Sequence, residues 1–329
     1  MADVTVVIPT KDRAALLREA LRSLREQTVS VAEVIVADDG SIDETAEVVR
    51  AFEARLLRNP AGGWGAAGGR NAGLAEVRTE LVAFLDSDDL LLPRAVEGLR
   101  EALDREPDAP FAYGQAITAR RGAGGWTAEG LIASRRDELA TLPSSIFVRN
   151  SVPSSGGLVR TAAAREVGGF DPSVPFNEDF YFWVDLALLG NPAHVPQIVS
   201  VYRLHADNRF IPSAGLDYER AAALGRGHPE LTPSLARHFG PRLCEHAADA
   251  VHRRDIRSLA RGVRSIFRLS PNALRTLAAA VEHQRTRHAM TALGQEEWDR
   301  LPDLRAWLST YDGLDPIESA GALGVPPSR

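Results

Sequence analysis

Short apolar runs alternate with amphipathic stretches over the first part of the chain. β-Branched and leucine-rich runs predict strands at residues 4–9, 34–38, 55–58 and 81–85. Apolar residues at helical spacing predict helices at residues 16–24, 43–54 and 70–77. Strands that alternate with helices in this way predict an α/β fold built on a parallel sheet.

Two local patterns refine this first part. The order Ser41-Ile42-Asp43-Glu44 fits a capping box and predicts the start of the second helix. The glycines of residues 62–69 predict a loop that leads into the third helix.

The periodicity changes twice further along the chain. Helices are predicted at 93–105, 161–167 and 177–190, and strands at 111–118 and 197–204. The glycines between 122 and 130 predict a flexible flap. We therefore expect an α/β domain over 1–210, with halves at about 1–110 and 111–210, and an α-helical C-terminal extension over 211–329.

Composition narrows the class of protein. The 329 residues are 44% hydrophobic, and no apolar run is long enough to span a bilayer. A net charge of -6 argues against nucleic acid as a partner. The single cysteine, Cys244, excludes an internal disulfide and suits a reducing compartment. Since the chain also opens directly on a strand pattern without a leader, we expect a cytoplasmic protein.

Polar residues gather where the first strands end. Residues 10–13 follow the first strand, 38–41 the second and 86–89 the fourth. Open α/β sheets bind ligands at this carboxyl edge. Asp86 and Asp88 are carboxylates in close succession that favour a cation such as Mg²⁺ or Mn²⁺, although aspartates in such a loop also serve as helix caps. Lys11 is the sole lysine, so arginines and backbone N–H groups must make most phosphate contacts.

Several segments resemble those of the family 2 glycosyltransferases, in the family's order, over roughly the first two hundred residues. They are VVIPTKDR, IVADDGSIDET, NPAGGWGAAGGRNAGL, FLDSDD, GGFDPS, NEDFYFW and YRLH. The resemblance implies a GT-A fold, a Rossmann-like mixed sheet sandwiched by helices. It also implies inverting transfer of a sugar from a nucleotide diphosphate donor to a hydroxyl of a small-molecule or glycan acceptor.

The resemblance also assigns residues to the donor side of the site. It implies that Asp88, Asp86 and His205 bind Mn²⁺ or Mg²⁺, with Asp88 the direct ligand. Because Lys11 stands where many relatives have an aromatic, a UDP-sugar is favoured but dTDP and GDP sugars stay open. A surface salt bridge is the alternative for Arg70, and a plain polar contact is the alternative for His205. The residues implied at the donor nucleotide are Pro9, Thr10, Asp12, Asp39, Arg70, Asp86 and Ser87.

On the acceptor side, the resemblance makes Asp179 the general base and Glu178 its positioning neighbour. Both acids are also favourable at a helix N-terminus without any catalytic role. Ser155 and Trp183 are expected to contact the acceptor, although the residues around Ser155 also fit an ordinary turn.

The sequence also leaves other hypotheses about function open. A nucleotidyltransferase of the same fold normally needs a glycine-rich loop after the first strand, and residues 10–13 contain no glycine. A non-catalytic sugar-nucleotide-binding protein would not need Asp86, Asp88 and Asp179. Residues 63–68 fit G-x-G-x-x-G, a dinucleotide-binding pattern, but they do not follow the first strand directly. In the extension, we expect the Arg-rich stretch 253–268 to face water, with a homodimer contact as the second possibility and an anionic acceptor also open.

Overall fold

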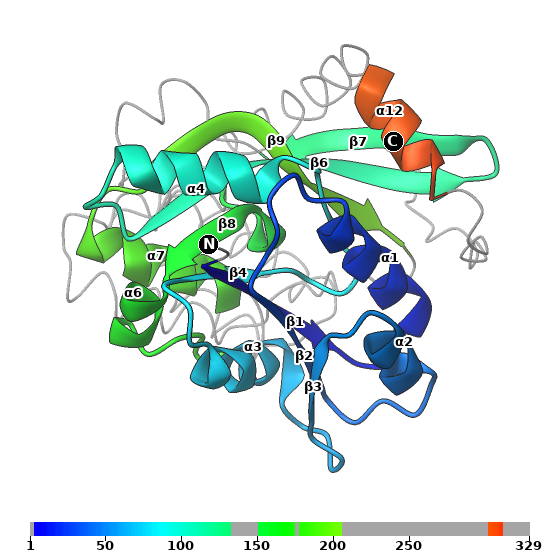
Figure 1. Ribbon diagram of the computed structural model, residues 1–329, viewed down its shortest axis with the longest axis horizontal. Helices are drawn as coiled ribbons and strands as arrows, with labels where there is room; N and C mark the ends of the chain where they lie inside the picture. The colour runs from blue at the N-terminus through cyan, green and yellow to red at the C-terminus, as the bar shows by residue number, and fades with distance from the viewer. Residues whose placement is uncertain (1–2, 133–150, 175–177, 206–301, 312–329) are drawn as a thin grey trace, which may run out of the picture.

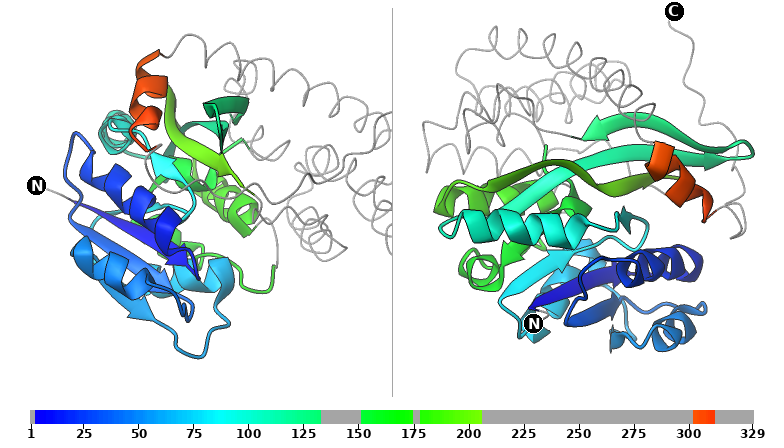
Figure 2. Two further views of the ribbon diagram at one scale, coloured as in Figure 1. Left: turned by 90° about the vertical axis from the view of Figure 1, so that its right-hand side faces the viewer. Right: turned by 45° about the horizontal axis from the view of Figure 1, so that its top comes forward.

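The computed structural model describes residues 3–132, 151–174, 178–205 and 302–311. Within them, nine strands form a single sheet in the order β3-β2-β1-β4-β8-β6-β9-β5, with β7 paired to β6. Helices lie on both of its faces (Figures 1 and 2). The strands are β1 (Val4–Thr10), β2 (Glu33–Asp38), β3 (Arg55–Arg58), β4 (Leu81–Phe84), β5 (Leu90–Leu91), β6 (Phe111–Gly122), β7 (Gly125–Ile132), β8 (Gly157–Arg160) and β9 (Ala193–Leu204). The helices are α1 (Ala14–Arg25), α2 (Thr45–Ala51), α3 (Gly65–Glu76), α4 (Ala95–Arg105), α6 (Thr161–Glu166), α7 (Glu178–Leu189) and α12 (Pro302–Ser309), with a 3₁₀ turn η2 (Ser154–Gly156).

The direction of the strands changes in the middle of the sheet. Strands β3, β2, β1 and β4 are parallel to one another, as predicted. Beyond β4 the sheet is mixed, because β8 is antiparallel to both β4 and β6, while β9 is parallel to β6. The prediction of a mixed α/β sheet sandwiched by helices is confirmed.

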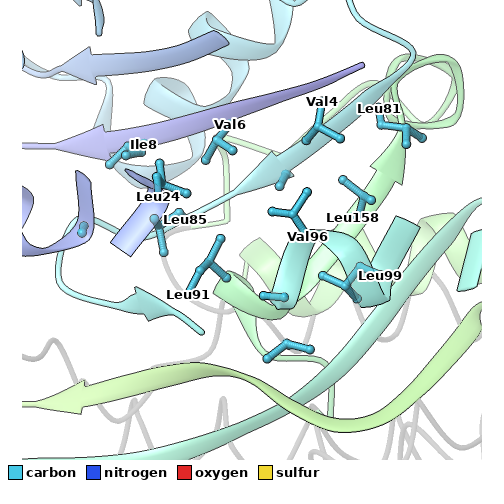
Figure 3. Close-up of a cluster of buried hydrophobic side chains, with 14 of the residues drawn as sticks. Val4, Val6, Ile8, Leu24, Leu81, Leu85, Leu91, Val96, Leu99 and Leu158 are labelled. Atoms are coloured by element: carbon cyan, nitrogen blue, oxygen red, sulfur yellow. The ribbon is translucent and has the colours of Figure 1, made fainter. Parts of the chain in front are cut away.

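Strand β1 shows why these residues form a central strand. Val4, Val6 and Ile8 pack on one face against α1, α2 and α4, as Figure 3 shows for part of that cluster. Val7 packs on the opposite face, with the apolar side chains of α3, α6 and α7. A strand covered on both faces carries a continuous apolar run rather than an alternating one.

The glycine-rich segment is a helix from Gly65 on, and only residues 62–64 form the predicted loop. Helix α3 begins at Gly65, five residues earlier than the predicted start. A Cβ at Gly73 would lie 2.3 Å from Val7 Cγ1, and a Cβ at Gly69 would lie 3.2 Å from Pro9 Cβ. Gly69 and Gly73 therefore let α3 pack closely on β1.

The predicted capping box is also wrong. Helix α2 begins at Thr45, and the side chain of its N-cap residue, Glu44, makes no capping hydrogen bond. Ser41 Oγ instead accepts a hydrogen bond from the Asp12 N–H at 2.8 Å. Asp43 accepts the N–H groups of Ala14 and Thr45. Ser41 therefore connects this loop to the loop after β1, while Asp43 caps the first residues of α1 and α2.

The predicted flap is a β-hairpin. Strands β6 and β7 pair along residues 116–132, and Gly122 faces Gly125 at the turn, where Gly125 has a φ of 93°. Helix α12 packs against this hairpin, at the same end of the sheet as α1 (Figure 1).

The expected helical extension is described only in part. Residues 206–301 and 312–329 lie outside the described residues, and with them the Arg-rich stretch 253–268. The described piece, α12, is helical. The division at residue 210 and the homodimer contact stay predictions. No helix in the part of the chain that the structure describes is long and apolar enough to cross a membrane.

Candidate active site

Three parallel strands end side by side at one edge of the sheet. β1 ends at Thr10, which pairs in register with Asp38 at the end of β2. β4, on the other side of β1, ends at Phe84, just before the acidic residues 86–89. The expected convergence of polar residues at this edge is therefore present in the structure.

The loops after β1 and β2 are connected by Asp12. Its backbone is left-handed, with a φ of 50°. Its Oδ1 accepts the N–H of Ile42 at 2.8 Å.

Thr10 is 6% exposed, and its hydroxyl has no hydrogen-bond partner within the described residues. Pro9 is buried against Gly69. Of the two residues in β1, Thr10 thus has a free polar atom for a ligand, whereas Pro9 serves packing.

The side chain of Asp39, in the loop after β2, reaches the N-terminus of α3. Its carboxylate accepts the N–H of Trp64 at 2.7 Å and that of Gly65 at 3.2 Å. Gly40, which follows it, has a φ of 84°, and a Cβ there would come 3.0 Å from the carbonyl oxygen of Asn59. Asp39 is therefore held in place by the helix N-terminus and by a turn that requires glycine.

Arg70 joins two acidic segments that are far apart in the sequence. Its Nη2 donates to Asp86 Oδ1 at 2.5 Å and to Ser154 Oγ at 3.1 Å, and its Nη1 donates to Glu178 Oε1 at 2.8 Å. The residue is 3% exposed, so this is a buried cluster and not the surface salt bridge considered above. Burial opposes its charge, but Asp86 and Glu178 outweigh that effect and raise the pKa of Arg70.

Asp179 follows Glu178 at the start of α7. Burial and, next, the charge of Glu178 raise the pKa of the Asp179 carboxyl to about 6, against the opposing charge of Arg70. Its Oδ1 also accepts the N–H of Phe180 at 2.8 Å. A carboxylate with this pKa is ionised at neutral pH and remains basic enough to accept a proton.

Asp88 and His205 lie side by side. His205 Nε2 is 3.1 Å from Asp88 Oδ2, and Arg13 Nη1 pairs with the same oxygen. Burial opposes ionisation of Asp88, but the His205 hydrogen bond and the Arg13 charge together hold its pKa below the ordinary value.

Asp88 and His205 supply the kinds of ligand atom that a divalent cation accepts. A carboxylate oxygen and an imidazole nitrogen are ligands that Mn²⁺ accepts, and Mg²⁺ or Mn²⁺ at such sites also takes substrate phosphate oxygens. Across the described ranges, no group of three or more His, Cys, Asp or Glu side chains assembles that could hold a metal ion. Asp88 and His205 would therefore need oxygens from a ligand or water to complete a coordination shell.

Ser155 supports the acidic loop from within. Ser155 Oγ donates to Asp89 Oδ2 at 2.6 Å and accepts the N–H of Asp86 at 3.1 Å. Ser155 and Ser87 are each 2% exposed. Burial and the charges of Asp88 and Asp86 raise the pKa of Asp89 well above its usual value. The expectation that Ser155 contacts an acceptor is not met, since its hydroxyl is occupied inside the protein.

Trp183 is also placed differently from the expectation. It is 1% exposed and lies in the core, with ring centroids 5.2 Å from both Phe111 and Phe182. A Cβ at Gly157 would lie 2.4 Å from its ring. The prediction of an acceptor contact is therefore wrong: the indole fills the apolar core under α7.

The structure also brings in residues that the sequence did not single out. Arg13 reaches Asp88, and Arg203 contacts the backbone of the same loop. Glu19 is buried on α1 between two arginines. Arg203 stood inside the YRLH segment, but Glu19 has no distinguishing signal, because a glutamate within an amphipathic helix normally faces water.

Two family models match the chain. The one described as "Glycosyl transferase family 2" matches residues 5–143, and the one described as "Glycosyl transferase family group 2" matches residues 81–220. The two matches overlap across the acidic segment 86–89, and the second extends past His205.

Curated relatives and solved structures agree with these matches. The chain is 35% identical over 245 residues to "Pre-mycofactocin glycosyltransferase" of Mycobacterium tuberculosis, covering 71% of this chain and 50% of that relative. It is 26% identical to an "Uncharacterized glycosyltransferase" of Haemophilus influenzae, covering 72% of this chain and 80% of that relative. The chain thus spans only about half the length of the mycobacterial relative. The crystal structure of S. aureus TarS 1-349 in complex with UDP-GlcNAc superposes with a TM-score of 0.67 at 17% identity, covering 91% of this chain and 92% of that one.

Proposed function

The chain belongs to glycosyl transferase family 2, and from that premise we propose that it moves a sugar from a nucleoside diphosphate donor to an acceptor hydroxyl with inversion at the anomeric carbon. The fold is that of the GT-A glycosyltransferases. The observation that carries the proposal is the cluster in which Arg70 joins Asp86 of one acidic segment to Glu178 of the other.

The position of Asp179 beside this cluster supports its proposed role as a base near the donor. Asp179 adjoins Glu178, while Asp86 belongs to the loop that also contains Asp88. Both terminal nitrogens of Arg70 are engaged by protein groups, so we assign it the task of orienting these carboxylates rather than a direct contact with diphosphate. Asp12, Asp39 and the unpartnered hydroxyl of Thr10 lie in the loops and strand where the nucleotide would bind.

The proposed reaction is a single displacement. A carboxylate oxygen of Asp179 takes the proton of the acceptor hydroxyl, and the hydroxyl oxygen forms a bond to the anomeric carbon. The bond from that carbon to the diphosphate oxygen breaks, and its electron pair leaves with the nucleoside diphosphate. Attack from the face opposite to the leaving group inverts the configuration. The raised pKa of Asp179, about 6, supports this role.

Asp88 and His205 are the residues that would hold Mn²⁺ or Mg²⁺ in this proposal. Such an ion neutralises charge on a departing diphosphate. Arg13 adds a positive charge at the same position, where it pairs with Asp88. The donor side of the site therefore has cationic protein groups beside its carboxylates.

For the donor we favour a UDP-sugar, since a neighbour with the same fold is solved with UDP-GlcNAc. Lys11 in the loop after β1 leaves dTDP and GDP sugars as the other candidates. The acceptor is a small molecule or a glycan, and we place the reaction in the cytoplasm, in keeping with the lone Cys244.

Nucleotide binding tests the proposal first. Thermal unfolding is measured with UDP, dTDP, GDP and NAD, each with and without Mn²⁺, for the wild type, Asp88→Ala and the exposed-site control Asp104→Asn. Ligand at about a hundred times its dissociation constant adds roughly 2.7 kcal/mol, which raises the melting temperature measurably. We expect one nucleoside diphosphate to stabilise the wild type and the control in the presence of Mn²⁺, and Asp88→Ala to abolish that effect.

Two outcomes would contradict the proposal. Stabilisation by NAD alone would make the glycine-rich start of α3 a dinucleotide site after all. Release of pyrophosphate from a nucleoside triphosphate and a sugar phosphate would identify a nucleotidyltransferase. No observation in the structure favours either of these activities over sugar transfer.

A further inference from the structure

Arg203 is a buried residue that holds the acidic loop from behind. It lies at the end of β9, is 4% exposed, and stands two positions before His205. Its Nε donates to the carbonyl oxygen of Asp88, and its Nη2 donates to that of Ser87 at 3.4 Å. Its backbone N–H donates to Asp89 Oδ1 at 3.1 Å. One side chain and its own amide therefore fix successive residues of the loop.

The other side of Arg203 faces helix α1. Its Nη1 pairs with Glu19, and its Nη2 donates to the carbonyl oxygen of Leu16 at 3.0 Å. Glu19 is 3% exposed, and its second oxygen accepts Arg121 Nη1 at 3.1 Å. Buried charges of this kind keep their positions because removing one partner leaves the other uncompensated.

Arg121 extends these contacts to the C-terminal helix. The same Nη1 donates to the carbonyl oxygen of Tyr311 at 2.6 Å. Tyr311 is fully buried, and Leu304 and Leu308 of α12 pack with it. They join an apolar cluster that also contains Leu90, Ile117, Ala119 and Val201.

We propose that α12 braces the acidic loop through the contacts Tyr311–Arg121–Glu19–Arg203, and that Arg203 is a positioning residue for Asp88 and His205. Residues 302–311 thereby form part of the support of the site, although residues 206–301 separate them from His205 in the sequence. What the loop binds rests on the proposed function, whereas the brace itself rests on the contacts alone.

If α12 braces the acidic loop in this way, a substitution in the β6–β7 hairpin should loosen residues 86–89, at the other end of these contacts. Amides in and beside the loop report this change, because Asp89 N–H bonds to Asp86, Leu91 N–H bonds to Ser23 Oγ, and Arg203 N–H bonds to Asp89. Their hydrogen exchange is measurable in the full chain without any ligand. A role of Arg121 limited to the hairpin would leave these amides unchanged.

The test compares two neighbouring arginines of β6. Arg121→Met removes the contact with Glu19 and Tyr311. Arg120→Met is the matched control, because Arg120 pairs with Glu129 at an exposed position. By hydrogen-exchange mass spectrometry, we expect peptides covering 86–91 and 200–205 to exchange about tenfold faster or more in Arg121→Met, and at the wild-type rate in Arg120→Met. Arg121→Lys, which keeps the charge, replaces Arg121→Met if that variant does not fold.

Donor binding provides the second readout. With Mn²⁺ and the nucleoside diphosphate that the wild type binds, calorimetry is expected to show weaker binding to Arg121→Met and to Arg203→Lys, with Arg120→Met unchanged. Faster exchange confined to residues 302–311, with 86–91 unchanged, would overturn the brace. If the wild type binds no nucleotide but the loop exchange responds as expected, the brace stands and the proposed function fails.

Discussion

Replacing Asp179 by asparagine should make the protein more stable while it removes activity. The carboxyl of an aspartate has an ordinary pKa of 3.8, and that of Asp179 has a pKa of about 6 in the folded protein. Because the folded pKa of an acid is raised, the charged form is disfavoured by folding: stability is lost as the pH rises from 3.8 towards 6, and the full loss persists above that range. One pH unit corresponds to about 1.4 kcal/mol, so the loss at pH 7 reaches at most about 3 kcal/mol.

Urea denaturation at pH 7 and at pH 3.5 measures this effect. Asp179→Asn removes the charge but keeps an oxygen that can accept the Phe180 N–H. The free energy of unfolding is therefore expected to rise by up to about 3 kcal/mol at pH 7 and to change little at pH 3.5. Because part of the side chain remains exposed, solvent screening brings the gain below that limit. Asp104→Asn, at an exposed position of α4, serves as the control and should show no such pH dependence.

The same pKa sets the pH profile of the reaction. Since Asp179 must be ionised to accept a proton, kcat/KM should rise about tenfold between pH 5 and pH 7. An Asp179→Asn variant no more stable than the wild type at pH 7, or a rate that is flat over that range, would refute the reasoning that burial and Glu178 raise this pKa.

Further predictions concern the cluster and the packing around it. Glu178→Gln removes the neighbouring charge that raises the pKa of Asp179, so the rising limb of the pH profile should move to lower pH. Arg70→Gln leaves Asp86 and Glu178 without their cation, so the free energy of unfolding from urea denaturation should fall by about 3 kcal/mol or more. The double variant Arg70→Gln with Glu178→Gln should recover part of that loss. An unchanged urea midpoint in Arg70→Gln would contradict the buried cluster. Gly73→Ala should destabilise by about 1 to 3 kcal/mol because its Cβ meets Val7, whereas Gly124→Ala, with open space around its Cβ, should not.

The sequence predicted the first half of the fold well because apolar runs and helical spacing are both local patterns. The apolar runs at residues 4–9 and 81–85 mark strands covered on both faces, and the helical spacing between them predicts the connections. Glycines misled the prediction twice. Gly69 and Gly73 permit a helix to approach Pro9 and Val7, and Gly122 and Gly125 form a hairpin turn.

The sequence predicted which acidic residues of the candidate site lie at the ends of strands. Asp86, Asp88 and Asp39 lie where the parallel strands end, which the pattern indicates directly. The partners of these residues depend on tertiary structure. Nothing in the sequence distinguishes Glu19 from a solvent-facing glutamate, and the aromatic character of Trp183 fits a binding surface as well as a core.

The most direct test of the account is the fate of the donor sugar. The purified chain is incubated with the nucleoside diphosphate sugar that it binds, Mn²⁺ and candidate acceptors, and the released nucleoside diphosphate and the anomeric configuration of the product are followed by ¹H NMR. We predict stoichiometric release of nucleoside diphosphate, a product of inverted configuration, and loss of both in Asp179→Asn but not in Asp104→Asn. A product of retained configuration, or undiminished turnover by Asp179→Asn, would contradict it.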